Sequence, residues 1–329
     1  MSEQTVLYDA PGPRARMITI VSSVIAAVLV IAGAYFFVYL PMDEKGQFDE
    51  ALWGPLLDPS NAVFDQVWER LGEGFLATLE AAVLAIVCSL VVGTLLAIWR
   101  VQLKALSRRR FPGVAGVRFL VVALNVITRF FVEVFRGIPV VVTIVFCWAL
   151  LPKLGIDLGG DLGALVLGLT IYNSVVIGEI LRSGMEGLPG GQREAADAIG
   201  LTTGQSIRLI LLPQAYRIML PALISQLVVV LKDTSLGFII TYEEALRISN
   251  TTIIPALHNP IQTFVVVGAI FILANYLLSK LASYTQRRLA RGRKAPGGRA
   301  APPAALSGEM PGAVAVQPAP VGGPPKTDD

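Results

Sequence analysis

The chain has 329 residues, of which 54% are hydrophobic and only 16% charged, and its mean hydropathy is +0.64. Several apolar runs approach or exceed the ~20 residues needed to cross a ~30 Å hydrocarbon core, which excludes an ordinary soluble domain. The single histidine, His258, argues against a histidine-based metal site or catalytic triad. Both cysteines, Cys88 and Cys147, lie inside apolar runs and are predicted to be packing residues.

The first apolar run covers residues 17–40 and is free of charged residues. It is longer than the apolar part of a signal peptide, and an acidic stretch follows it instead of a small-residue cleavage site. We therefore expect a retained first transmembrane helix after a cytoplasmic N-terminus, residues 1–16. The acidic residues 41–74 are predicted to form an extracytoplasmic loop.

Residues 75–99 are the second predicted span, and they are followed by a basic loop without acidic residues. The positive-inside rule places this loop in the cytoplasm. Residues 119–152 are long enough for a helix of about 50 Å, which is too long for one upright crossing. One crossing fits better than two, because two would need about 20 residues each. A break is expected near Gly137 and Pro139, because glycine and proline interrupt helices.

Three further spans are predicted at residues 162–181, 207–231 and 261–281. Six crossings place both termini in the cytoplasm, together with every strongly basic segment. The predicted fold is therefore an all-α polytopic membrane protein with six transmembrane helices. Residues 75–284 form its main transmembrane domain. Residues 285–329 are predicted to be a cytoplasmic tail, basic at first and then disordered, because its Ala/Pro/Gly-rich composition buries too little apolar surface.

The segment 188–213 lies between the fourth and fifth spans and is predicted to form a helix–turn–helix. Residues 192–199 suit a short helix, and Gly200 suits the left-handed position that ends one. Thr202 and Gln205 have the spacing of a capping box, which would start the next helix. These local signals fit a well-formed loop between spans as well as a docking element, and they name no partner.

The same segment carries the sequence EAA, then G after three residues, then I and LP after nine more. It resembles the EAA loop of binding-protein-dependent ABC importer permeases. In that family this loop forms a coupling helix that contacts the ATPase subunit, so the resemblance implies that role here. The residues that match and are expected to couple to the ATPase are Glu194, Ala195, Ala196, Gly200, Ile210 and Pro213.

Further motifs resemble the polar amino-acid branch of that family, and members that transport glutamate or glutamine are most similar. They are the FRGIP sequence of residues 135–139, the tyrosine, glutamate and arginine of 172–182, PQA at 213–215 and KDTSL at 232–236. An isoleucine replaces the usual threonine in the first. The resemblance covers residues 75–282, so the first helix is an addition to it.

The resemblance implies three partners: an ABC ATPase dimer, a second permease chain that is identical or related, and an extracytoplasmic solute-binding protein. The chain itself has no Walker A sequence, so ATP hydrolysis is expected on a separate subunit. It is predicted to be a transport subunit in the bacterial inner membrane and not an enzyme. We expect no catalytic residue, cofactor, metal or nucleic-acid partner, and contact with membrane lipids.

Polar residues inside the spans are costly and are candidates for a substrate path. An amino acid needs groups for an ammonium and a carboxylate, which carboxylates, amides and hydroxyls supply. Hydrogen bonding between helices is an equally good explanation for such residues. The candidates are Glu80, Asn125, Tyr172, Asn173, Ser174 and Asn275.

The predicted function is an ATP-driven importer permease for polar amino acids, working by alternating access. A permease for another small polar solute and an ion-coupled secondary amino-acid transporter are the alternatives. The first would keep the EAA loop and lose the other motifs, whereas the second would show internal repeats and no EAA loop.

Overall fold

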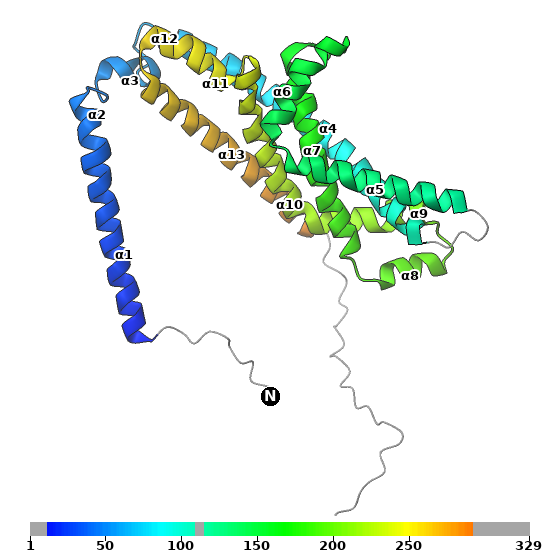
Figure 1. The fold of residues 1–329 in the computed structure, drawn as a ribbon. Helices are drawn as coiled ribbons and strands as arrows, with labels where there is room; N and C mark the ends of the chain where they lie inside the picture. The colour runs from blue at the N-terminus through cyan, green and yellow to red at the C-terminus, as the bar shows by residue number, and fades with distance from the viewer. Residues whose placement is uncertain (1–11, 109–114, 292–329) are drawn as a thin grey trace, which may run out of the picture. The chain divides into compact units, whose positions relative to one another are not determined.

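Every regular element is a helix in the residues that the computed structural model describes, 12–108 and 115–291 (Figure 1). Residues 1–11, 109–114 and 292–329 lie outside this range; they include Arg109 and Arg110 of the predicted basic loop. The helices are α1 (Pro13–Ala34), α2 (Leu40–Glu44), α3 (Glu50–Leu57), α4 (Phe64–Arg108), α5 (Ala115–Gly137), α6 (Val140–Leu150), α7 (Gly160–Glu186), α8 (Gly191–Ala198), α9 (Thr203–Ser206), α10 (Leu212–Asp233), α11 (Ala245–Ile248), α12 (Ile254–Leu257) and α13 (Pro260–Arg291). Short π or 3₁₀ turns extend several of them: η1 (Tyr35–Tyr39), η2 (Pro152–Leu154), η3 (Ile207–Leu211), η4 (Thr234–Ile240) and η5 (Ser249–Ile253).

Five continuous helical segments among the described residues are long and apolar enough to cross a membrane. A sixth crossing is possible where α5 and α6 form one broken span. This agrees with the six predicted crossings. The five segments are Pro13–Glu44, Phe64–Ser107, Gly160–Glu186, Thr203–Ile240 and Pro260–Thr285.

The break between α5 and α6 falls at the predicted position. The two helices meet at an angle of 103° across Ile138 and Pro139. Proline has no backbone N–H to donate, and it disfavours a helical conformation at the residue before it. The sharp turn lets α5 run in a direction of its own while α6 packs on α7 (Figure 1).

The long helices α4 and α7 form the centre of the bundle. Gly93 of α4 allows their close approach, because a Cβ atom there would lie 2.8 Å from the side chain of Ile177 and 2.9 Å from the carbonyl of Ser174. With 1.5 Å of rise per residue, the 45 residues of α4 extend about 67 Å. This helix therefore links the end of the bundle that carries α8 to the opposite end, where α11 packs on it.

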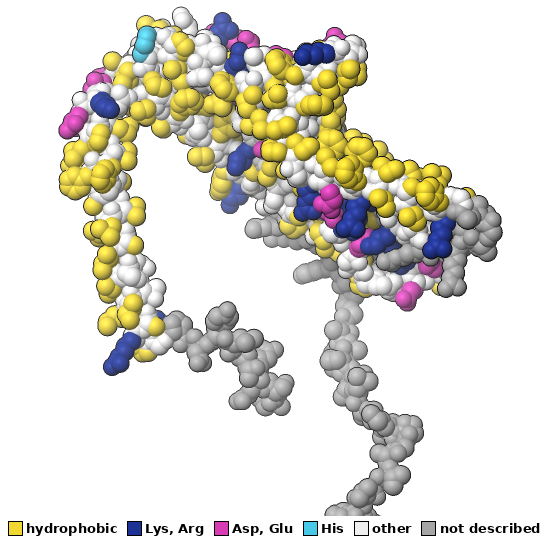
Figure 2. Space-filling view, viewed as in Figure 1, with side chains coloured by type: hydrophobic (Ala, Val, Ile, Leu, Met, Phe, Trp, Pro, Cys, Tyr) yellow, Lys and Arg dark blue, Asp and Glu magenta, His cyan; other side chains and the backbone are white. Residues whose placement is uncertain are grey.

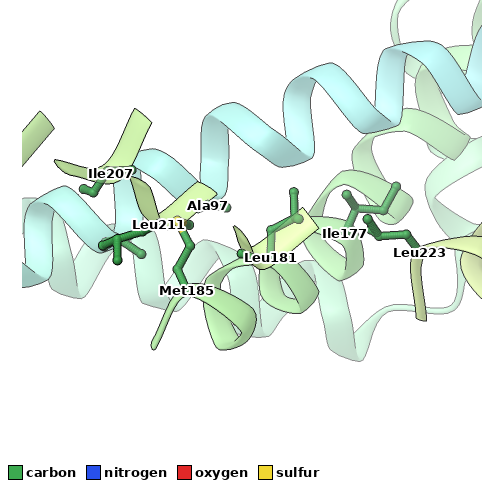
Figure 3. Close-up of a cluster of buried hydrophobic side chains, with 9 residues drawn as sticks. Ala97, Ile177, Leu181, Met185, Ile207, Leu211 and Leu223 are labelled. Atoms are coloured by element: carbon green, nitrogen blue, oxygen red, sulfur yellow. The ribbon is translucent and has the colours of Figure 1, made fainter. Parts of the chain in front are cut away.

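Three buried apolar clusters follow α4 along its length. The cluster nearest α8 joins α4, α7, η3 and α10 through residues such as Ile177, Leu181 and Leu211 (Figure 3). A middle cluster joins α4 to α6, α7 and α10. The third joins α3, the start of α4 and α13, around the fully buried Leu56. Apolar side chains cover much of the surface in Figure 2, which suits contact with lipid.

The first helix is attached through the segment that follows it. No residue of α1 is buried, and its apolar side chains are exposed on all sides. The next segment is fixed to the start of α13 and to the residue before it. The Asn259 side chain donates to the Leu52 carbonyl at 2.9 Å, and Gln262 of α13 donates to the Gln47 carbonyl at 2.6 Å. The added helix is therefore tied to the bundle at the end opposite α8.

Candidate functional site

The EAA segment folds into the predicted helix–turn–helix. Helix α8 ends before Gly200, whose φ of +77° is the left-handed conformation that glycine adopts without strain. Thr202 then caps α9: its hydroxyl accepts from the Gln205 backbone N–H, and the Gln205 side chain accepts from the Thr202 N–H at 2.8 Å. These reciprocal bonds satisfy two of the free N–H groups at the start of the helix.

The structure divides the six predicted coupling residues between two environments. Glu194, Ala195 and Gly200 are exposed on or just after α8, whereas Ala196 is fully buried. Ile210 is half-buried against the apolar cluster nearest α8. The sixth, Pro213, is exposed at the start of α10, directly after the π turn η3 and inside the continuous helical segment Thr203–Ile240.

The apolar residues at the end of α8 lie on two different sides of the helix. In the structure only Ala196 packs inward, and Ile199 is 73% exposed. The exposed Ala195 and Ile199 are left as a small apolar surface pointing away from the protein core.

A network of five charged side chains joins α4 to α7 close to α8. Arg182 donates from Nε to Glu179 at 3.0 Å and pairs with Glu186 at 2.7 Å. Lys104 of α4 donates to the same oxygen of Glu186 at 2.7 Å, and Arg100 pairs with Glu179. Four of these side chains are only 15–26% exposed, so solvent screens them weakly.

Sequence reasoning identified Glu179 and Arg182 as part of a family motif but missed the network. One signal was present: Glu179, Arg182 and Glu186 have the three- and four-residue spacings that place side chains on one helix face. Arg100 and Lys104 on α4 are also four residues apart. That the two faces meet depends on the packing of α4 against α7, which spacing alone does not give.

A cavity of about 430 Å³ separates this network from α8. Glu186 and Lys104 line one side, and Arg193, Glu194 and Asp197 of α8 line another. The second carboxylate oxygen of Glu186 is buried and accepts no hydrogen bond in the described part of the chain. A displacement of α8 would therefore change the electrostatic environment of the ion pairs that hold α4 to α7.

The structure does not gather the six candidate substrate-path residues. Asn173 is fully buried, donates to the Leu169 carbonyl at 2.9 Å and accepts from Gln226 of α10 at 2.7 Å. Ser174 is buried and donates to the carbonyl of Ile171. The bonds of Asn173 and Ser174 are therefore those expected if these residues serve hydrogen bonding within and between helices and not a substrate path. The other four are the exposed Glu80, the half-buried Asn125 and Tyr172, and Asn275.

Glu244 is a buried carboxylic acid at the opposite end of the bundle, outside the spans, and sequence reasoning missed it. Its side chain caps α11 by accepting from the backbone N–H groups of Leu246 and Arg247 at 2.9 and 2.8 Å. Burial nevertheless raises its pKa from 4.5 to about 7, because desolvation outweighs these bonds and the nearby Arg247 charge. The folded protein thus binds this proton more tightly than the unfolded chain.

The raised pKa of Glu244 predicts a loss of stability as the pH rises. Below pH 4.5 the group is protonated in both states, and above about 7 the folded protein must bury its charge. Between about pH 5 and 8 we expect the free energy of unfolding to fall by about 2–3 kcal/mol. Thermal unfolding of the purified protein measures this. Glu244→Gln should flatten the pH profile, whereas the exposed neighbour variant Glu243→Gln should keep it; equal profiles in all three would contradict the assignment.

Comparison with known proteins identifies the chain's relatives. The family described as binding-protein-dependent transport system inner membrane component matches residues 111–291. The glutamate transport system permease protein GluD of Corynebacterium glutamicum is 38% identical over 252 residues, which cover 76% of this chain and 84% of that protein. The glutamate/aspartate import permease protein GltK of Escherichia coli O6:H1 is 29% identical over 225 residues, 66% of this chain and 92% of that protein.

A solved structure shares the fold. It is the crystal structure of an amino acid ABC transporter with histidines. The superposition covers 68% of this chain and 96% of the matched chain, with a TM-score of 0.55 and 24% sequence identity. The predicted family and fold class are therefore confirmed. Family membership also implies an ATPase and a substrate-binding protein as partners. The chain belongs to the family of binding-protein-dependent transport system inner membrane components, multi-pass proteins that act as transport subunits and not as enzymes.

Proposed function

We propose that this chain is the permease subunit of an ATP-driven importer for polar amino acids, with glutamate or glutamine as its cargo. The observation that carries the proposal is the EAA sequence on an exposed helix–turn–helix at one end of the bundle. The named cargo of GluD and GltK supports an acidic amino acid. ATP binding and hydrolysis on a separate subunit supply the driving force for alternating access.

The coupling surface is the exposed part of α8. Ala195 and Ile199 offer apolar contact area, and Glu194 offers a charge to a basic group of the ATPase. The other three residues of the motif have positioning roles. Ala196 anchors α8 to the bundle, and Ile210 and Pro213 hold the start of α10. Gly200 supplies the turn between α8 and α9. The cavity that links α8 to the ion pairs of α4 and α7 supports this path for the motion.

The α8 end of the bundle faces the cytoplasm in this proposal, with both chain termini on the same side. Residues 1–16 and 285–329 are the cytoplasmic ends, residues 17–40 the added first helix, 41–74 the extracytoplasmic segment and 75–284 the permease domain. Two permease chains, identical or related, enclose the pathway, and an ATPase dimer binds their two α8 helices. The solute-binding protein docks at the opposite end.

This orientation predicts one-sided labelling of α9. In a variant without Cys88 and Cys147, the exposed Gln205→Cys should react with a membrane-impermeant thiol reagent only when the cytoplasmic face is accessible. Ser60→Cys, in the exposed segment after α3, should react only from the outer face. Labelling of Gln205→Cys in intact cells would contradict the orientation.

Uptake by purified components tests the function. Vesicles are prepared with this chain, its partner permease and its ATPase, and ATP is enclosed in the lumen on the side of the ATPase. They should concentrate glutamate or glutamine when the binding protein is added outside. Omission of either the ATPase or the binding protein should reduce uptake to the level of empty vesicles. Uptake driven by an ion gradient without the ATPase would support a secondary transporter instead, and ATP-driven uptake of a different solute class alone would support the other alternative.

A further inference from the structure

Two adjoining cavities lie beneath α8, at the end of the bundle. The larger, of about 430 Å³, is the one that separates α8 from the ion network of α4 and α7. The smaller, of about 270 Å³, lies between α8, α9 and η3. Arg193 and Asp197 of α8 line both cavities, so one molecule can extend from the first into the second. The larger volume alone is within the ~300–1,000 Å³ that is typical of small-molecule sites.

Each cavity is lined by a residue with a buried polar atom that has no hydrogen-bond partner in the described part of the chain. In the larger cavity it is Oε1 of Glu186, whose other oxygen accepts from Lys104. In the smaller cavity it is the hydroxyl of Ser206, a residue only 2% exposed at the end of α9. Buried polar atoms are almost always hydrogen-bonded, because the loss of water without a replacement is costly. The two atoms therefore indicate a polar occupant that donates to Glu186 and bonds to Ser206.

The charged residues around the larger cavity have both signs. Arg193 is half-buried and forms no ion pair with any described residue, so its guanidinium is available to a carboxylate. Lys104 is the other basic residue of the described lining, and it already pairs with Glu186. The acidic residues of that lining are Glu186, Glu194 and Asp197, so they outnumber the basic ones. Such a lining accepts a molecule that carries both an ammonium and a carboxylate, and it disfavours one with a net negative charge.

We propose that this site binds a free α-amino acid with an uncharged polar side chain from the cytoplasm, and that the bound molecule restrains α8. Its carboxylate pairs with Arg193, its ammonium donates to Oε1 of Glu186, and its side chain reaches Ser206. Glutamine suits the site better than glutamate, because a second carboxylate would meet the excess of acidic residues.

The bound amino acid regulates uptake in this proposal. Because Arg193 lies on α8 and Glu186 on α7, the molecule bridges the coupling helix to the bundle. It therefore opposes the displacement of α8 that ATPase closure requires, and amino acid that accumulates in the cytoplasm slows its own uptake. The inference rests on the proposed function for the orientation and the movement of α8. It adds a regulatory site that is separate from the path of the cargo.

Inhibition from the cytoplasmic side tests the regulation. Uptake vesicles with ATP in the lumen are also loaded with unlabelled L-glutamine, and the initial rate of labelled uptake is divided by the rate without lumenal glutamine. In wild type this ratio should fall about fivefold or more, the lower end of typical allosteric couplings. The same concentration of lumenal L-glutamate should lower the ratio less.

Two cavity variants and one matched control locate the effect. Ser206→Ala and Arg193→Gln should each bring the ratio back toward one, because each loses a bond to the amino acid. Ser206→Ala removes a hydroxyl that has no partner among the described residues, so the fold is kept. Arg208→Gln is the control: Arg208 is exposed on η3 and outside both cavity linings, so its ratio should equal that of wild type.

Binding to the complex in lipid nanodiscs, without the binding protein, tests the site independently of transport. Labelled L-glutamine should bind wild type and Arg208→Gln equally, and it should bind Arg193→Gln about tenfold more weakly, because a charge-assisted hydrogen bond is lost. Equal binding in all three, or a wild type that lumenal glutamine does not inhibit, would overturn the inference and leave the proposed function intact. A wild type that shows the binding difference but performs no ATP-driven uptake would instead remove the function and leave the site.

Discussion

Gly200→Val is expected to abolish ATP-driven uptake while leaving the chain in the membrane. Gly200 has a φ of +77°, and a β-branched side chain resists that left-handed conformation. No atom lies within 4 Å of a Cβ built at this position, so the effect comes from the backbone and not from a clash. The turn must then open, which displaces α8 from the start of α9. Uptake into vesicles, normalised to the amount of inserted chain, measures the effect.

Gly200→Asn is the control for this prediction. Asparagine tolerates the left-handed conformation better than other side chains, so this variant should retain most of the uptake. Thr202→Ala is a milder companion, because it removes only the helix cap, at a cost of about 1 kcal/mol. Wild-type uptake by Gly200→Val would show that the turn is not needed for coupling.

Arg182→Leu is expected to lower the free energy of unfolding by about 3 kcal/mol or more and to reduce uptake. Arg182 is the cation that bridges Glu179 and Glu186, and its loss leaves two half-buried carboxylates with one partner each. Breaking a poorly solvated ion pair from one side is costly because the remaining charge cannot recover its hydration. Chemical denaturation of the purified protein measures the change in stability.

The exposed ion pair Arg70–Glu73 provides a matched comparison. Its side chains are 61% and 52% exposed, so Arg70→Leu should change the free energy of unfolding by about 0.5 kcal/mol or less. Arg182→Lys keeps the charge but not the forked geometry, and it should lie between Arg182→Leu and wild type. Equal stability of Arg182→Leu and Arg70→Leu would show that the network contributes no more than a surface pair.

The parts of the coupling segment that depend on local chemistry could be predicted from the sequence. Gly200 at a left-handed position and the reciprocal bonds of Thr202 and Gln205 involve neighbours along the chain, and the structure confirms both. The break at Pro139 is local in the same sense. On α8, Ala196 packs inward while Ala195 and Ile199 are exposed, and the order of apolar residues along the chain does not say which of them faces the bundle.

The helices extend beyond the predicted spans. The sequence places the second span at residues 75–99, and α4 covers Phe64–Arg108. An apolar run marks only the part of a helix that crosses hydrocarbon, and polar turns continue the same helix into the interface. The first helix likewise begins at Pro13 and continues, through η1, to Glu44.

Contacts between distant segments could not be predicted. The ion network needs the register of α4 against α7, which the close approach at Gly93 fixes. The hydrogen bond from Gln226 to Asn173 needs the packing of α10 on α7. In both cases the sequence gives the polar residues and their depth, while their partners are more than 50 positions away.

Site-specific crosslinking of α8 to the ATPase tests the central claim most directly. In the complex without native cysteines, Ala195→Cys should form a crosslink to the ATPase subunit, because Ala195 is exposed on α8. Ser60→Cys, at the opposite end of the bundle, is the control and should form none. A crosslink to the ATPase from Ser60→Cys, with none from Ala195→Cys, would contradict coupling through this helix.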